Sequence, residues 1–184
     1  MKFSASCALA AATVGLAQAS TTYIRVARDA TVSFNGITCG DIPCYSIPLG
    51  LKNDLVSFKG NRDYERILLG FDLPAANPIS KCVLMIPSPI EELPTSAYLL
   101  TATVTDNDWT EDTVCGANKK NDGTEVDSVE VQPGHAPGSI DVTDACQEAK
   151  GGKLSLFVES NFSLIRFNSL QSGSMDLFSL AVTY

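Results

Sequence analysis

Short segments with alternating apolar and polar residues recur along most of the chain. Within residues 98–105, apolar side chains occupy the even positions and threonines occupy most of the odd ones. Similar alternation occurs at residues 153–159 and 178–184, and a period of two is typical of strands with one buried face. Residues 82–86 are continuously apolar up to Pro87, as expected for a strand that is covered on both faces. The pattern therefore predicts a protein rich in short β-strands.

Turn-forming residues separate these segments, and only one stretch has helical features. The turn pairs are Asn35-Gly36, Asn77-Pro78, Asp122-Gly123, Pro133-Gly134, Pro137-Gly138 and Gly151-Gly152. Residues 143–150 form the helical candidate, with Thr143 or Asp144 as its cap. Residues 106–138 are the least regular stretch, and one strand is predicted there at 125–131. Many short strands between such turns indicate an all-β fold: a two-sheet β-sandwich with at most one short helix.

Residues 1–19 have the features of a secretory signal peptide. Lys2 provides a positive charge, residues 3–16 are mostly small and apolar, and an Ala-x-Ala cleavage signal follows. A buried N-terminal helix is the alternative. We therefore expect a secreted, extracellular product with one domain over residues 20–184. No later segment approaches the roughly 18 consecutive apolar residues of a membrane-spanning helix, so a soluble product is expected.

The chain is acidic, with a formal net charge of −8 and a pI near 4.5, which makes nucleic acids and anionic membranes poor partners. Much of its limited cationic charge nevertheless lies in or near residues 61–73. If these residues form one strand, the side chains that enter the core are Ile67, Leu69, Phe71 and Leu73. The opposite face then presents Arg62, Tyr64, Arg66 and Leu68.

This outward face has the chemistry needed to recognise an acidic sugar. The ring of Tyr64 offers a flat apolar platform, and the guanidinium groups of Arg62 and Arg66 can each pair with a carboxylate. Further cations expected near this face are Lys52, Lys59 and Arg166. The alternative is that the arginines form surface ion pairs with Asp63 and Glu65, worth about 0–1 kcal/mol each.

Five cysteines lie outside the predicted signal peptide, and in an oxidising compartment four of them can pair: Cys39, Cys44, Cys82, Cys115 and Cys146. Cys39 and Cys44 share one loop, where a short disulfide can form, whereas the pairing of the other three stays open. The cysteine left over can link two chains of an otherwise monomeric protein. A single histidine and the lack of a second close cysteine pair argue against zinc. Asn161 begins an N-glycosylation sequon, either occupied or vacant.

Five short motifs occur in a fixed order, at residues 66–74, 79–84, 109–114, 141–145 and 167–169. Together they resemble the DNRLRE family, which includes carbohydrate-binding module family 96, and the resemblance extends from about residue 27 to the end of the chain. It implies a jelly-roll β-sandwich that is usually non-catalytic and that binds acidic polysaccharides such as alginate. It also implies that the binding residues lie at residues 62–66 and Lys52.

Other candidate chemistry is weaker. Trp109, the single tryptophan, is either a sugar platform or part of the core. An enzyme is not expected, because the single histidine, His135, lies in a turn and no carboxylate has an apolar sequence context that would raise its pKa. No cofactor is expected, although Asp29 and Asp141 can supply oxygen ligands for a structural calcium ion.

The leading hypothesis is therefore a secreted, non-catalytic carbohydrate-binding module. It is expected to recognise an acidic, uronate-rich polysaccharide through an exposed strand face of arginine, tyrosine and lysine. The alternative is a secreted structural or host-interaction β-sandwich that has lost sugar binding. A small lyase or hydrolase is the third hypothesis.

Overall fold

The computed structural model describes residues 19–34, 38–61, 63–74, 78–149, 152–162 and 164–184. Outside these ranges lie the predicted signal peptide except for Ala19, the candidate binding residue Arg62 and Ser163 of the sequon. None of the helices in the described ranges is long and apolar enough to cross a membrane.

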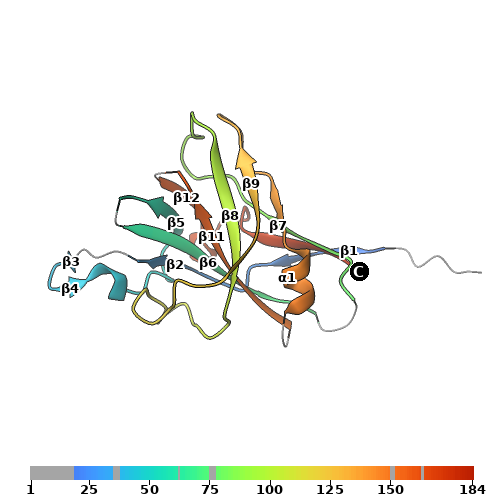
Figure 1. Cartoon of the computed structure of the whole chain (residues 1–184), viewed down its shortest axis with the longest axis horizontal. Helices are drawn as coiled ribbons and strands as arrows, with labels where there is room; N and C mark the ends of the chain where they lie inside the picture. Colours follow the sequence, from blue (N-terminus) through green and yellow to red (C-terminus); the bar gives the residue numbers. More distant parts are fainter. Residues whose placement is uncertain (1–18, 35–37, 62, 75–77, 150–151, 163) are drawn as a thin grey trace, which may run out of the picture.

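Two antiparallel sheets make up most of the molecule (Figure 1). The four-stranded sheet has the order β1 (Thr21–Arg25), β13 (Ser179–Thr183), β7 (Lys81–Met85) and β10 (Ser139–Asp141). The seven-stranded sheet runs through β12 (Leu164–Asn168), β5 (Asp54–Lys59), β6 (Tyr64–Asp72), β11 (Lys153–Ser160), β8 (Tyr98–Thr105) and β9 (Thr124–Val131). β2 (Arg28–Ser33) also pairs with β6. The prediction of an all-β sandwich is confirmed; its jelly-roll connectivity stays a prediction.

The alternation in the sequence marks the residues that pack between the two sheets. Tyr98, Leu100 and Ala102 of β8 are buried, and so are Leu180 and Val182 of β13. Each of these strands contributes one face to the main core, because successive side chains of a strand point to opposite sides. The strands predicted from periodicity are therefore confirmed.

A second apolar cluster lies on the other face of the seven-stranded sheet. It contains Ala30, Val32, Leu68, Trp109, Val114 and Phe157, with Phe34 packed against it. Trp109 and Val114 come from residues 106–123, here called the covering segment, which joins β8 to β9 (Figure 1). An ion pair of 2.7 Å between Lys119 Nζ and Asp106 Oδ2 ties the two ends of this segment together. The sheet is consequently covered on both faces here, which alternation alone did not predict.

One short α-helix, α1 (Thr143–Glu148), packs against β7. It ends two residues before the predicted limit at residue 150. The prediction that Thr143 or Asp144 caps it is wrong, since the N-cap position is Val142, without a side-chain cap bond. Instead, Asp141 Oδ1 accepts hydrogen bonds from the backbone N–H of Thr143 at 3.0 Å and from its hydroxyl at 2.6 Å.

Two disulfides are present in the described part of the chain. Cys39–Cys44 joins β3 (Thr38–Cys39) to the short 3-10 turn η1 (Cys44–Ser46), beside β4 (Ile42–Pro43), which confirms the predicted staple. Cys82–Cys146 links β7 to α1, a pairing that the sequence left open. Cys115 is free and buried, so an intermolecular disulfide would first require this residue to become exposed.

Candidate functional site

Arg66 is buried, with 6% of its surface exposed, so the prediction that it lies on an open strand face is wrong. Its guanidinium Nε lies 3.1 Å from Glu159 Oε2, and Nη1 donates a 2.8 Å hydrogen bond to Asn121 Oδ1. The guanidinium carbon stands 4.2 Å from the ring centroid of Phe157. The covering segment supplies Asn121 and closes over this face, which is why the side chain is enclosed.

Tyr64 and Lys59 stay accessible beside the buried arginine. They face each other in the register of β5 and β6, and Lys59 is exposed while Tyr64 is half-buried. The Tyr64 ring stacks on Phe34 with centroids 5.2 Å apart, and its hydroxyl is hydrogen-bonded to the side-chain amide of Asn121. The phenol is therefore fixed in position.

These side chains open into a hollow of about 250 Å³, here called the β5–β6 hollow. It is lined by Phe58, Lys59, Tyr64, Glu65, Asn121, Glu159 and Ser160. Glu159 is already paired with Arg66, and burial raises the pKa of Glu65 above its ordinary value. Lys59 is the exposed cation among the residues that line the hollow.

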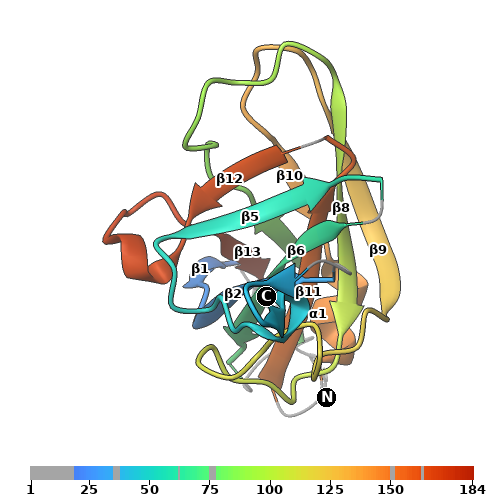
Figure 2. The ribbon, with the colours of Figure 1, turned by 90° about the vertical axis from the view of Figure 1, so that its left-hand side faces the viewer.

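Arg166 lies on the neighbouring strand β12, which Figure 2 shows beside β5. It is half-exposed, stands opposite Val56 in the β5–β12 register, and pairs with Asp54 at 3.7 Å and Glu91 at 3.3 Å. The sequence expectation of an outward Arg166 is thus met, but its charge is partly compensated by two carboxylates.

Lys52 is exposed just before β5, at the end of the strand opposite Lys59. The structure therefore separates the predicted cations instead of gathering them at one point. Lys52, Arg166 and Lys59 follow one another along the length of β5, and Arg62 lies outside the described residues.

Trp109 belongs to the second apolar cluster and is 7% exposed, so it offers no platform to a sugar. Its indole N–H donates a 2.9 Å hydrogen bond to Ser155 Oγ, and the guanidinium of Arg28 lies 4.4 Å from its ring centroid. The interpretation of Trp109 as a core residue is the one that the structure supports.

Sequence reasoning named two of the seven residues that line the β5–β6 hollow, Lys59 and Tyr64, and missed the other five, among them Phe58 and Asn121. Phe58 was not detectable from alternation, because Val56 and Phe58 are the apolar residues around polar Ser57, yet the structure buries Leu55 and Ser57 and leaves Phe58 half-buried on the other face of β5. Nothing in the sequence predicted a role for Asn121, because it lies in the non-periodic covering segment. Its hydrogen bonds to Tyr64 and Arg66 form only when the chain folds.

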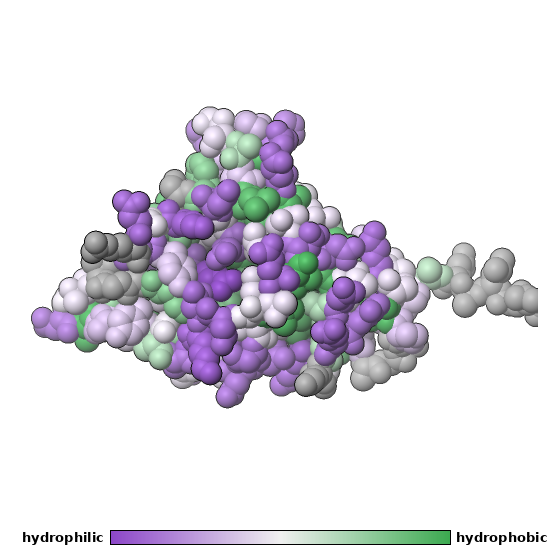
Figure 3. Space-filling model, viewed as in Figure 1, coloured by the Kyte–Doolittle hydropathy of each residue, from purple (hydrophilic) through white to green (hydrophobic). Residues whose placement is uncertain are grey.

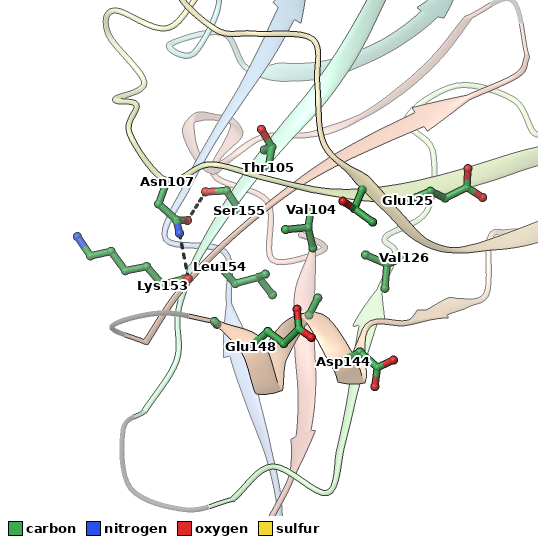
Figure 4. A pocket seen from close by; sticks show the side chains of 13 residues that line it. Val104, Thr105, Asn107, Glu125, Val126, Asp144, Glu148, Lys153, Leu154 and Ser155 are labelled. Atoms are coloured by element: carbon green, nitrogen blue, oxygen red, sulfur yellow. Dashed lines mark hydrogen bonds between the residues drawn. The ribbon is translucent and has the colours of Figure 1, made fainter.

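A larger hollow of about 440 Å³ lies between β8, β9, β11 and α1 (Figure 4). Its rim carries the carboxylates of Glu125, Asp144 and Glu148 and the ammonium of Lys153. Three carboxylates against one cation disfavour an anionic polymer here. The surface view in Figure 3 shows polar residues interrupted by small apolar areas on this side of the molecule.

Asp29 is fully buried, and its burial raises the pKa of the carboxyl to about 7, with a further contribution from Glu111. The prediction that no carboxylate has an apolar environment is therefore wrong. Asp29 and Asp141 lie on strands of different sheets. Within the described ranges, no group of three or more His, Cys, Asp or Glu side chains is placed to hold a metal.

We expect the stability of the metal-free protein to fall as the pH rises from about 4 to about 7. The folded protein holds the Asp29 proton more tightly than the unfolded chain, so each pH unit in this window costs about 1.4 kcal/mol. Urea unfolding in a chelating buffer across this range measures the effect. Asp29→Asn should remove this component; an identical pH slope in both proteins would contradict the assignment.

Asn161, the predicted glycosylation site, is exposed at the end of β11. Its side-chain Oδ1 accepts a 2.7 Å hydrogen bond from the backbone N–H of Leu99. Occupancy of the sequon stays a prediction.

Comparison with known proteins gives two matches. Residues 46–183 match the model of carbohydrate-binding module family 96. The chain is also 30% identical over 152 residues to an uncharacterized secreted protein of Arthroderma benhamiae, and the alignment covers 80% of this chain and 78% of the other. The family match includes β5, β6 and β12, the strands that carry the exposed cations.

Proposed function

The chain belongs to carbohydrate-binding module family 96, and from this premise we propose that it is a secreted, non-catalytic module that binds an acidic polysaccharide along β5. The observation that carries the proposal is the pairing of Lys59 with Tyr64 at the mouth of the β5–β6 hollow. The ammonium of Lys59 can pair with a sugar carboxylate, while the rings of Phe58 and Tyr64 offer apolar surface to the sugar.

The spacing of the cations fits a polymer better than a single sugar. β5 has six residues and spans about 20 Å, so one monosaccharide cannot contact both Lys52 and Lys59. A polysaccharide lying along the strand can meet Lys59 at one end, Arg166 in the middle and Lys52 at the other. Arg166 would exchange its exposed carboxylate partners for those of the ligand, an exchange of small cost because exposed ion pairs are weak.

The remaining predicted residues have different parts in this proposal. Arg62 lies outside the described residues and remains a candidate contact on the basis of the sequence alone. Arg66 donates a hydrogen bond to Asn121 and forms an ion pair with Glu159, two residues that line the hollow. In this proposal it is a positioning residue that does not contact the ligand.

Replacing Lys59 with glutamate should weaken binding to alginate or pectate about tenfold, because an attractive contact of about 1 kcal/mol is exchanged for a repulsive one. Affinity electrophoresis of the purified protein in gels containing each polymer measures the change. Retention by the unmodified protein should also decrease as salt is added, since the contacts are solvent-exposed.

Lys81→Glu is the matched control, because it makes the same change in net charge at an exposed lysine of the other sheet. It should leave retention close to that of the unmodified protein. Equal weakening by both substitutions would reject the site on β5 and leave only a general charge effect. If neither polymer retains the unmodified protein, the acidic-ligand proposal fails.

A further inference from the structure

β1 is an outer strand of the four-stranded sheet, and one of its two edges is open. It pairs with β13 on one side, and no other strand in the described ranges pairs with it. Four of its five residues are exposed, among them the large side chain of Tyr23. Such an edge presents backbone donors and acceptors that can pair with a strand of another molecule.

The ladder between β1 and β13 determines which backbone groups face this edge. Ser20 and Val26, just outside the two ends of β1, are hydrogen-bonded through their backbones to the residues on either side of β13, at 3.1 and 3.2 Å. An antiparallel strand bonds to one neighbour at every second position, so the even positions from 20 to 26 bond to the β13 side. The N–H and C=O groups of Thr21, Tyr23 and Arg25 therefore face outward.

The two outer strands of the seven-stranded sheet are protected against such pairing. β9 carries three carboxylates, those of Glu125, Asp127 and Glu130. At the opposite end of the sheet, Ile90 donates a 3.0 Å backbone hydrogen bond to a carbonyl of β12. Charged side chains and covering segments both prevent edge pairing. β1 has neither within the described part of the chain, apart from the charge of Arg25 at its end.

We propose that β1 pairs with β1 of a second copy of this chain, antiparallel and about a two-fold axis at Tyr23. In this register Tyr23 lies opposite Tyr23 of the second copy, and Thr21 lies opposite Arg25 of the second copy. The free donors of each strand then meet the free acceptors of the other. The contact uses the same surface on both copies, so it closes as a dimer with one continuous sheet.

The side chains of β1 are compatible with this register. Ile24 packs against the main core, so Thr21, Tyr23 and Arg25 share the outer face of the sheet. The two tyrosines form an aromatic cross-strand pair, and Arg25 faces an uncharged threonine, so no like charges are opposed. β1 also contains no carboxylate, which lets two copies of a chain with a net charge of −8 meet at this edge.

The contact is small, so the dimer should be weak. β1 contributes five residues from each copy, whereas each partner of a stable complex contributes about 20–30. We expect a dissociation constant of about 0.1–1 mM. If the proposed function holds, a polysaccharide that engages the β5 rows of two copies would favour the dimer further. The pairing itself does not depend on that function.

Sedimentation velocity of the purified protein without polysaccharide, from about 10 μM to about 1 mM, should show a shift from monomer to dimer. Amide hydrogen exchange measured by NMR locates the contact. At the higher concentration, exchange at Thr21, Tyr23 and Arg25 should slow about two- to fivefold, while Thr22 and Ile24 are already bonded to β13 and should not change. A protein that stays monomeric at 1 mM, or a dimer without these changes, overturns the proposal.

Tyr23→Pro removes the central outward N–H without breaking a bond to β13, so it should abolish the dimer. Tyr23→Lys places two ammonium groups opposite each other, so it should weaken the dimer about tenfold, with partial recovery in salt. Tyr23→Val is the matched control, because it keeps the N–H and a strand-forming side chain and should dimerise. If Tyr23→Pro fails to fold, Tyr23→Lys alone decides. Association of Tyr23→Lys as strong as that of the unmodified protein rejects the pairing.

Discussion

Replacing Cys82 and Cys146 together with alanine should lower the free energy of unfolding by about 4 kcal/mol, whereas the same change at Cys39 and Cys44 should cost about 2 kcal/mol. The cysteines of the first pair are 64 residues apart in sequence and those of the second pair are 5 apart. A disulfide restricts the unfolded chain, and the restriction grows with the length of the loop that it closes. Urea unfolding of the two double variants, with m-values compared, measures the difference.

The position of each bridge in the fold strengthens this expectation. Cys82 and Cys146 are buried in the main core and fasten α1 to β7, while Cys39 is exposed in the small ribbon of β3 and β4. The short bridge therefore serves as an internal control for the removal of two sulfur atoms. A larger loss from the Cys39 and Cys44 variant would show that local strain or packing, and not loop closure, determines the contribution.

The strands could be predicted because each presents one face to a common core. The even positions of residues 98–105 and 178–184 are apolar for this reason, and both segments contain strands with most of those residues buried. The same periodicity cannot report whether the other face is open. Arg66 alternates with core residues as an exposed side chain would, yet the covering segment encloses it.

Two residues did signal the second cluster, and one of them is Leu68, an apolar side chain on the outward face of β6. Phe157 breaks the polar side of the alternation in β11, and it packs with Leu68 and Trp109 beneath the covering segment. The environments of Asp29 and Asn121 had no comparable signal, because each depends on segments that meet only in the folded chain. Candidate residues were thus predictable on regular strands and not where an irregular segment covers them.

Replacing Trp109 with alanine should lower the free energy of unfolding by about 3–5 kcal/mol, the range for removing a large aromatic side chain from a core. The change would remove the ring between the covering segment and the sheet, and it would leave Ser155 Oγ without the indole donor. Trp109→Phe should cost less, because it keeps part of the ring volume. Urea unfolding of both variants provides the measurement.

The exposed Tyr23 on β1 is the matched control, with 70% of its surface accessible. Tyr23→Ala should change stability by no more than about 0.5 kcal/mol. Because Trp109 is enclosed, folded Trp109→Phe should also bind alginate or pectate as the unmodified protein does, although Lys59→Glu should not. A Trp109→Phe protein of unchanged stability that has lost polysaccharide binding would instead identify the tryptophan as a ligand contact and reject the closed arrangement of the covering segment.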